Sequence, residues 1–382
     1  EYTYTNLKDC RMTYKVLACD IPMQGAHSRV LASGEVVLSS IAPGETGKAH
    51  FSLPASFREG DILKLEAFDK EKRSICEWTY PIHLASQYFD SHLSHTCRSA
   101  SSGPVSVCND GKQIILKSDK VSITFDAGTG MIACILSDGQ EVPFTDGPVA
   151  VGMKMIYQPA ESYVRQDSDG AVFCAHYKGG ADSIVWRLTP QGLLYMDAVL
   201  LNRASGGGGF DDAFMDTEVY NLGITFSYPE QNCKGMKWMG RGPYRVWKNR
   251  IAGTNYNIWH KEYNNTITGE SYDNLVYPEF KGYHANVYWA TLESDEVPFT
   301  IYSRTDGIFY RIFTPVEPKY SAKKTMPDFP EGDISFLLDI PAICSFKPIE
   351  QQGPNSQPGN IRIKKGDKGL QLNLMFDFRK TF

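Results

Sequence analysis

Polar and apolar positions alternate over short stretches of this chain, and sustained helical periods are rare. Clear cases are Lys120–Phe125, Val185–Leu188 and Ile361–Lys364, and the strand-like stretches are bounded by Gly, Pro, Asn or Asp. Alternation with a period of two puts one set of side chains on each face of a strand, and the bounding residues suit turns. The pattern therefore predicts an all-β protein with antiparallel sheets and very little helix.

The order of these stretches predicts two domains. Residues 1–85 have the strand and turn spacing of an immunoglobulin-like β-sandwich. Its expected strands are Arg11–Cys19, Ser33–Ser39, His50–Leu53, Ile62–Phe68 and Cys76–His83. Residues 86–107 are rich in Ser and His and weakly patterned, which predicts a linker. Residues 108–382 continue as strands, and a unit of that size needs two large sheets stacked face to face.

Composition narrows the possible partners. Aromatic residues make up 12% of the chain, which suits pleated sheets and also the apolar faces of sugars. A net charge of −5 argues against nucleic-acid binding, and no apolar run is long enough to span a membrane. Nine cysteines form no CxxC pair, so we expect most to be small buried hydrophobes, with Cys97 and Cys108 as a local disulfide candidate.

The chain opens at Glu1 with neither Met nor an apolar stretch. We therefore expect no signal peptide, and interpret the chain as a piece of a longer protein. The compartment stays open, with a periplasmic or extracellular location favoured over a cytoplasmic one.

Four segments together resemble the last domain of β-galactosidases in glycoside hydrolase family 2. Phe125–Ile132 followed by Asp138–Val142 is similar to the hairpin that opens that domain. Asn221–Pro229 and then Trp238–Tyr244, which reads WMGRGPY, are similar to a family strand followed by a W-x-G-x-G-P turn. In the N-terminal region, the turn Ala42–Glu45 (Ala-Pro-Gly-Glu) and Glu77-Trp78 also resemble the immunoglobulin-like domain that precedes the last domain in this family.

The resemblance covers nearly the whole chain and implies a large galactose-mutarotase-like β-supersandwich after the immunoglobulin-like domain. Family 2 enzymes hydrolyse with two carboxylates on a (β/α)8 barrel, and this chain contains no βα repeat that could form one. Two departures point to an outlying relative. Gly147–Gly152 replaces a usual polar family segment, and the loop at 347–360 lacks the Trp that family members present to galactosides.

The stretch Met236–Arg250 interleaves aromatic and basic residues around a Gly-x-Gly-Pro turn. Because Pro243 removes a backbone donor, the turn cannot be a phosphate cradle. Two interpretations remain: a structural corner with the Trp packed beneath the turn, or a rim where Arg241, Tyr244 or Trp247 touches a saccharide or the absent barrel.

Other candidate chemistry is more dispersed. Glu279 and His284 could form an acid–base pair of the kind a sugar epimerase needs, or a hydrogen-bonded structural turn. Gln351, Gln352 and Asn355 lie in a polar loop whose amides can both donate to and accept from sugar hydroxyls. The acidic stretch from Asp211 to Glu218 is expected to be a solvated loop, and the scattered histidines show no metal spacing.

The sequence thus predicts a non-catalytic C-terminal module of a family 2 glycosidase that shapes the substrate cleft and supports the barrel. Its expected partners are an oligo- or polysaccharide and the barrel of the parent chain, with no cofactor and no metal. The alternatives are a free-standing carbohydrate-binding protein and a sugar epimerase.

Overall fold

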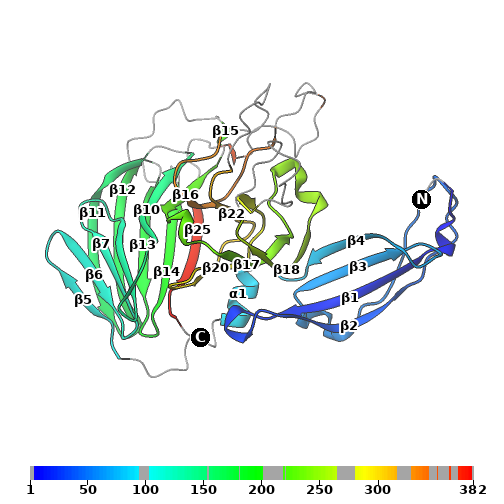
Figure 1. Cartoon of the computed structure of the whole chain (residues 1–382), viewed down its shortest axis with the longest axis horizontal. Helices are drawn as coiled ribbons and strands as arrows, with labels where there is room; N and C mark the ends of the chain where they lie inside the picture. Colours follow the sequence, from blue (N-terminus) through cyan, green and yellow to red (C-terminus); the bar gives the residue numbers. More distant parts are fainter. Residues whose placement is uncertain are drawn as a thin grey trace.

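The computed structural model is all-β apart from one α-helix and short 3-10 turns in the part of the chain that it describes. Every strand pairing given there is antiparallel, which confirms the fold class expected from the alternating pattern (Figure 1). The described residues are 4–93, 103–152, 155–179, 181–200, 218–219, 221–264, 280–315, 328–343, 351, 361–362 and 369–380.

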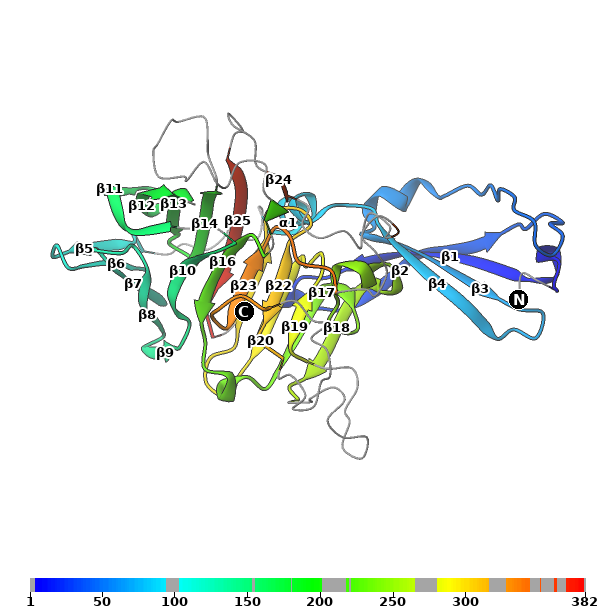
Figure 2. The ribbon, with the colours of Figure 1, turned by 90° about the horizontal axis from the view of Figure 1, so that it is seen from above.

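The N-terminal region forms one four-stranded sheet. Its strands, in spatial order, are β2 (Ser28–Val36), β1 (Arg11–Cys19), β3 (Ile62–Phe68) and β4 (Ser74–Pro81). The sheet projects away from the rest of the molecule, as Figures 1 and 2 show. Two of the expected strands, Arg11–Cys19 and Ile62–Phe68, agree with the structure at both ends.

The second layer of the N-terminal region is an irregular segment. The strand expected at His50–Leu53 is absent, so that prediction is wrong. Phe51 and Leu53 instead pack as single side chains against the cluster that contains Tyr14 and Val16. Pro54 follows directly and has no N–H for a strand ladder, which favours packing without pairing.

The larger part of the chain is a sandwich of stacked antiparallel sheets. The largest sheet has nine strands, in the order β11 (Met155–Asp167), β12 (Gly170–Gly179), β13 (Ala181–Leu188), β14 (Leu193–Leu200), β25 (Leu370–Asp377), β21 (Phe299–Ser303), β20 (Trp289–Glu293), β17 (Gly235–Gly242) and β18 (Asn255–Glu262).

Two five-stranded sheets pack against the nine-stranded sheet. One has the order β10 (Thr145–Val151), β16 (Gly223–Ser227), β23 (Ile334–Leu337), β22 (Phe309–Ile312) and β19 (Gly282–His284). The other is a meander of β5 (Ser106–Asn109), β6 (Gln113–Lys117), β7 (Val121–Asp126), β8 (Ile132–Ser137) and β9 (Gln140–Val142). A short pair, β15 (Glu218–Val219) with β24 (Ile361–Arg362), completes the described strands.

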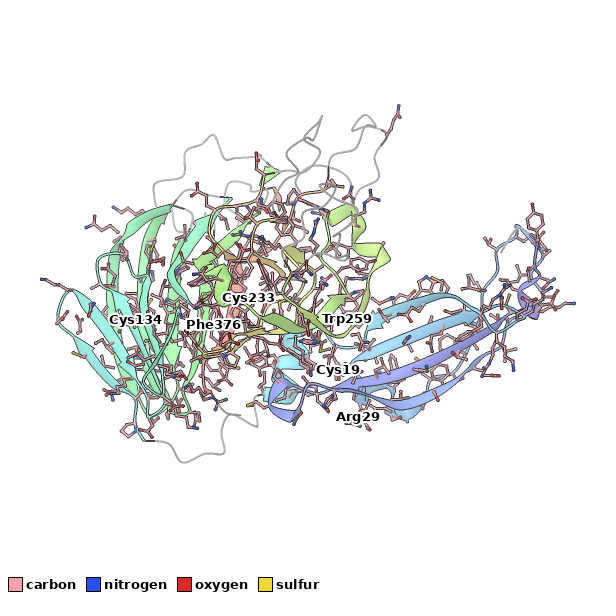
Figure 3. All side chains as sticks on the ribbon, viewed as in Figure 1. Cys19, Arg29, Cys134, Cys233, Trp259 and Phe376 are labelled. Carbon is pink, nitrogen blue, oxygen red and sulfur yellow. The ribbon has the colours of Figure 1, made fainter. Side chains whose placement is uncertain are left out.

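The sandwich core lies between the nine-stranded sheet and the two smaller ones. Phe376 and Trp186 from the large sheet meet Phe226 and Phe336 from one facing sheet and Phe125 from the other, all in one buried cluster. Figure 3 labels Phe376 within this core. These side chains occupy alternate positions on their strands, which is why the period of two in the sequence predicted the sandwich.

The two parts of the chain meet through helix α1 (Ala85–Leu93). Its buried side chains Tyr88, Phe89 and Leu93 pack between the base of the N-terminal sheet and the outer face of the nine-stranded sheet, in a cluster that includes Cys19 and Trp289. Figure 3 labels Cys19 at this junction.

Within the expected linker, residues 86–93 belong to helix α1, residues 106–107 begin β5, and residues 94–102 lie outside the described part. The sequence pattern missed the helix because it is short, and its apolar face carries only a few large side chains. The domain limits at 85 and 108 stay predictions. No described helix is long and apolar enough to cross a membrane.

Hydrogen bonds reinforce this junction. The Tyr88 hydroxyl donates to the Cys19 carbonyl at 2.7 Å, and the Tyr288 hydroxyl donates to the His83 carbonyl at 2.6 Å. The backbone N–H of Tyr256 donates to Thr79 Oγ1 at 2.6 Å. Since these groups are buried or half-buried, each bond satisfies a polar atom that water reaches poorly.

Candidate functional site

The Gly-x-Gly-Pro stretch lies at the end of β17, and its tryptophan is structural. Trp238 is fully buried, and its Nε1 donates to the Arg241 carbonyl at 3.1 Å. A Cβ on Gly242 would lie 2.6 Å from the Trp259 ring, so only glycine fits there. The turn is therefore fixed by the hydrogen bond from Trp238 and by the close approach of the Trp259 ring.

Arg241 binds its own corner of the sheet. Its guanidinium lies 4.5 Å from the centre of the Tyr256 ring, a cation–π contact, and Nη1 donates to the Thr254 carbonyl at 2.9 Å. Tyr244, two residues beyond the strand, is half-buried. Of the three rim candidates, Arg241 thus has a structural role through the groups that surround it.

Trp247 is buried rather than presented to solvent. Only 5% of its surface is exposed, and its ring packs against Tyr283 and Phe329 with centroid separations of 5.4 and 5.2 Å. The neighbouring Lys248 forms a 2.5 Å ion pair with Asp339, which is also buried. A stacking platform for a sugar needs a free ring face, and Trp247 is too deeply buried to present one.

His284 is enclosed in the protein interior. Its side chain is 1% exposed and contacts the edge of Trp238 at a centroid distance of 5.0 Å. Burial lowers the pKa of His284 to about 4, and the nearby Arg245 charge acts in the same direction. The ring is therefore neutral near pH 7, and its Nε2 lies 3.3 Å from the Phe280 carbonyl.

Several candidate residues predicted from the sequence lie outside the described part of the chain. Glu279, Gln352 and Asn355 lie outside the described residues, so the Glu279–His284 pair and most of the amide loop stay predictions. Gln351 is described and exposed. The side chains of the acidic stretch from Asp211 to Glu218 also lie outside the described part.

Metal ligands and disulfides receive a partial test. Within the described ranges, no cluster of three or more His, Cys, Asp or Glu could hold a metal ion. The cysteines described there are free thiols, including Cys108, while Cys97 lies outside those ranges.

Arg311 on β22 is a buried arginine that the sequence analysis did not single out. Its guanidinium donates to the carbonyls of Gly332 and Glu331, each at 2.8 Å, and to Ser335 Oγ at 2.8 Å. Burial lowers its pKa to about 10, so it remains charged at neutral pH. Since oxygen atoms of the protein surround it, Arg311 ties the loop before β23 to the sheet. The sequence signal was a lone arginine within the apolar strand Phe309–Ile312.

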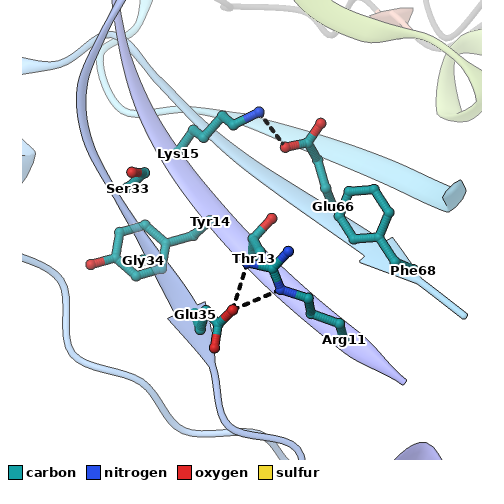
Figure 4. A pocket seen from close by; sticks show the side chains of 9 residues that line it. All are labelled: Arg11, Thr13, Tyr14, Lys15, Ser33, Gly34, Glu35, Glu66 and Phe68. Atoms are coloured by element: carbon teal, nitrogen blue, oxygen red, sulfur yellow. Dashed lines mark hydrogen bonds and ion pairs between the residues drawn. The ribbon is translucent and has the colours of Figure 1, made fainter. Parts of the chain in front are cut away.

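A shallow pocket lies on the polar face of the N-terminal sheet (Figure 4). Its charged residues are paired across the strands: Arg11 with Glu35 at 2.6 Å, and Lys15 with Glu66 at 2.7 Å. Its volume is about 290 Å³. That volume lies at the lower limit of small-molecule sites, so the pocket is better explained by cross-strand pairing than by a ligand.

A larger groove lies on the outer face of the nine-stranded sheet, beside helix α1. Its volume is about 760 Å³, which falls in the range of small-molecule sites. The lining residues come from α1, the turns around β12 and β13, strands β13 and β14, and the segment directly after β21: Phe89, Ser168, Asp169, Arg187, Thr189, Pro190, Gln191, Tyr195, Asp197 and Arg304. No motif in the sequence marks any of these residues as a candidate for binding.

Comparisons with known proteins identify no family for the chain. No protein-family profile matches it, and no curated protein matches it. Among solved structures, it is similar to a protein of Escherichia coli K12 that has been proposed to be an aldose 1-epimerase. The two share 11% identity, with a TM-score of 0.32, over 72% of this chain and 99% of that one. A TM-score this low adds nothing to the fold already described, and the family 2 resemblance remains an inference from the sequence motifs.

Proposed function

We propose that the chain is a non-catalytic, carbohydrate-associated module from the C-terminal part of a family 2 glycosidase. In the parent enzyme it would shape one wall of the substrate cleft and support the catalytic (β/α)8 barrel. The proposal rests first on the sequence motifs, which run in the family's order along nearly the whole chain. The all-β sandwich agrees with that order but is shared by proteins of many functions.

The observation that carries the proposal is the role of the motif residues themselves. Trp238 and Gly242, the most family-like residues, hold a strand corner through packing and a hydrogen bond. Trp247 packs in a separate buried cluster with Val246 and Tyr283. A support module is expected to share structural residues such as these with its relatives. An enzyme is expected to keep a set of reactive side chains exposed to the substrate as well.

The epimerase alternative needs an acid–base pair that can reach a sugar. Burial of His284 and its pKa near 4 count against that role, because the ring is neither accessible nor near its titration point at neutral pH. A carbohydrate-binding function without catalysis remains compatible with the polar groove beside α1.

The test is hydrolysis and epimerisation by the purified chain. We expect no release of nitrophenol from nitrophenyl β-galactoside, β-glucoside or β-mannoside, and no acceleration of galactose mutarotation measured by polarimetry. Turnover that persists through purification and disappears in the His284→Gln variant would contradict the proposal. A second check is the reading frame upstream of Glu1, where we expect a (β/α)8 barrel.

A further inference from the structure

The groove beside α1 contains a preorganised arginine–carboxylate pair. Arg304 Nη1 donates to Asp197 Oδ1 at 2.6 Å. The guanidinium also lies 5.0 Å from the centre of the Tyr195 ring and 5.6 Å from that of Phe89. These contacts hold the planar group in one orientation, so little side-chain freedom is left to lose when a ligand binds.

The pair keeps hydrogen-bonding capacity toward the groove. One guanidinium nitrogen bonds one carboxylate oxygen, which leaves further N–H groups on Arg304 and the second oxygen of Asp197. The side chains of Arg304 and Asp197 are 27% and 47% exposed. Adjacent donors and acceptors of this kind match neighbouring hydroxyls of a sugar, since each hydroxyl can donate and accept.

A second pair of charges lies across the groove. Arg187 on β13 bonds Asp167 at 3.3 Å and is 32% exposed, and Asp169 is exposed in the adjoining turn. The charged residues that line the groove are thus two arginines, Arg187 and Arg304, and two aspartates, Asp169 and Asp197. Their formal charges cancel, so the groove offers strong polar contacts without a net field for an anion or a cation.

The position of the groove disfavours a peptide. β13 and β14 are interior strands, each hydrogen-bonded on both sides, so neither presents a free edge for an added strand. Tyr195 and Pro190, both half-buried, supply a limited apolar wall beside the charged groups, while Phe89 is buried. Polar contacts with an apolar wall are what a pyranose requires, because it has a hydroxyl rim and C–H faces.

We propose that this groove binds a short neutral oligosaccharide. Arg187, Arg304, Asp169 and Asp197 bond its hydroxyls, and the apolar wall contacts a sugar face. The site lies on the outer face of the large sheet, apart from the Trp238 corner. Saccharide binding there does not depend on whether the parent chain contains a catalytic barrel.

The experiment is isothermal titration calorimetry of the purified chain with lactose, cellobiose, mannobiose and xylobiose, and with digalacturonate as an acidic contrast. We expect saturable binding of at least one neutral disaccharide in the millimolar range or tighter, and weaker binding of digalacturonate. No binding of any neutral disaccharide, or a preference for digalacturonate, overturns the proposal.

Two arginines on the same aspartate provide a matched control. Arg187 and Arg165 both pair with Asp167, but only Arg187 lines the groove. We expect Arg187→Gln to raise the Kd about tenfold, the equivalent of one lost charged hydrogen bond, and Arg165→Gln to leave it unchanged. Equal effects of the two substitutions overturn the assignment, because both remove an ion pair to Asp167.

Asp169→Asn keeps the shape of an exposed turn residue but replaces one acceptor oxygen by a donor. It therefore tests whether the carboxylate of Asp169 accepts hydrogen bonds from sugar hydroxyls, and it leaves the Arg304–Asp197 pair intact. We expect it to weaken binding severalfold while the thermal midpoint stays the same. Binding that resists both Arg187→Gln and Asp169→Asn would place the saccharide elsewhere and refute the proposed groove. Hydrolysis of nitrophenyl glycosides would contradict the non-catalytic function and leave this site untouched.

Discussion

The hydroxyl of Thr79 joins the N-terminal sheet to the sandwich, and its removal measures how strongly the two parts are coupled. Thr79 Oγ1 accepts from the buried backbone N–H of Tyr256 at 2.6 Å and contacts Asn255 Oδ1 at 3.2 Å as a donor. Thr79→Val replaces the hydroxyl by a methyl group of similar size. The strand keeps a β-branched residue, so its conformational preference changes little.

The expected cost follows from what each partner loses. The Tyr256 N–H is left without an acceptor where both residues are less than 9% exposed, which costs about 1–3 kcal/mol. Asn255 is half-buried and keeps its bond to Glu77, so its oxygen adds little. We therefore expect the free energy of unfolding to fall by about 1–3 kcal/mol.

The assay is urea unfolding followed by tryptophan fluorescence and far-ultraviolet circular dichroism. Thr13→Val is the control: Thr13 is a half-buried residue of β1 whose hydroxyl bonds no described residue, so we expect a change within about 0.5 kcal/mol. Equal losses in the two variants, or none in Thr79→Val, would refute the coupling through this bond. If the substitution shifts only one of two unfolding transitions, the one that reports on the N-terminal sheet, the two parts unfold independently.

Two further predictions concern buried ionisable side chains. Because the folded-state pKa of His284 is lowered from 6.5 to about 4, the unfolded state takes up this proton first as the pH falls. The free energy of unfolding should then drop by about 1.4 kcal/mol per pH unit across that window, and urea titrations at pH 4.5 and 7 should show a smaller drop in His284→Gln. Arg311→Met should lower the free energy of unfolding by at least about 2 kcal/mol, because it removes the charged donor to two carbonyls and three hydroxyls. Arg165→Met, at an exposed position, should change it by less than about 0.5 kcal/mol; similar losses would contradict the role given to Arg311.

Local pattern accounts for the parts of the fold that the sequence predicted well. Strands Arg11–Cys19 and Ile62–Phe68 match at both ends because alternation and turn residues are encoded within the segment itself. Asp138 and Gly139 likewise form the turn between β8 and β9, with positive φ angles of 46° and 80°, which these residue types tolerate well. His50–Leu53 has a similar local pattern but finds no partner strand, and packs by its side chains instead.

Arrangements that depend on distant residues were beyond the sequence. Trp247 is of a residue type that suits a sugar platform, but Tyr283 and Phe329 pack against its ring. Helix α1 is stabilised by the two surfaces that it separates rather than by its own pattern.

The sequence by itself determined an all-β chain with its strand periodicity, its turns and its resemblance to a known sandwich, because these follow from residue order over a few positions. Only the tertiary structure decided which polar side chains share a surface. Arg304 and Asp197 are 107 positions apart and meet because β21 and β14 both pair with β25. No spacing rule along the chain encodes such a meeting, since sheet order is set by packing of the whole core.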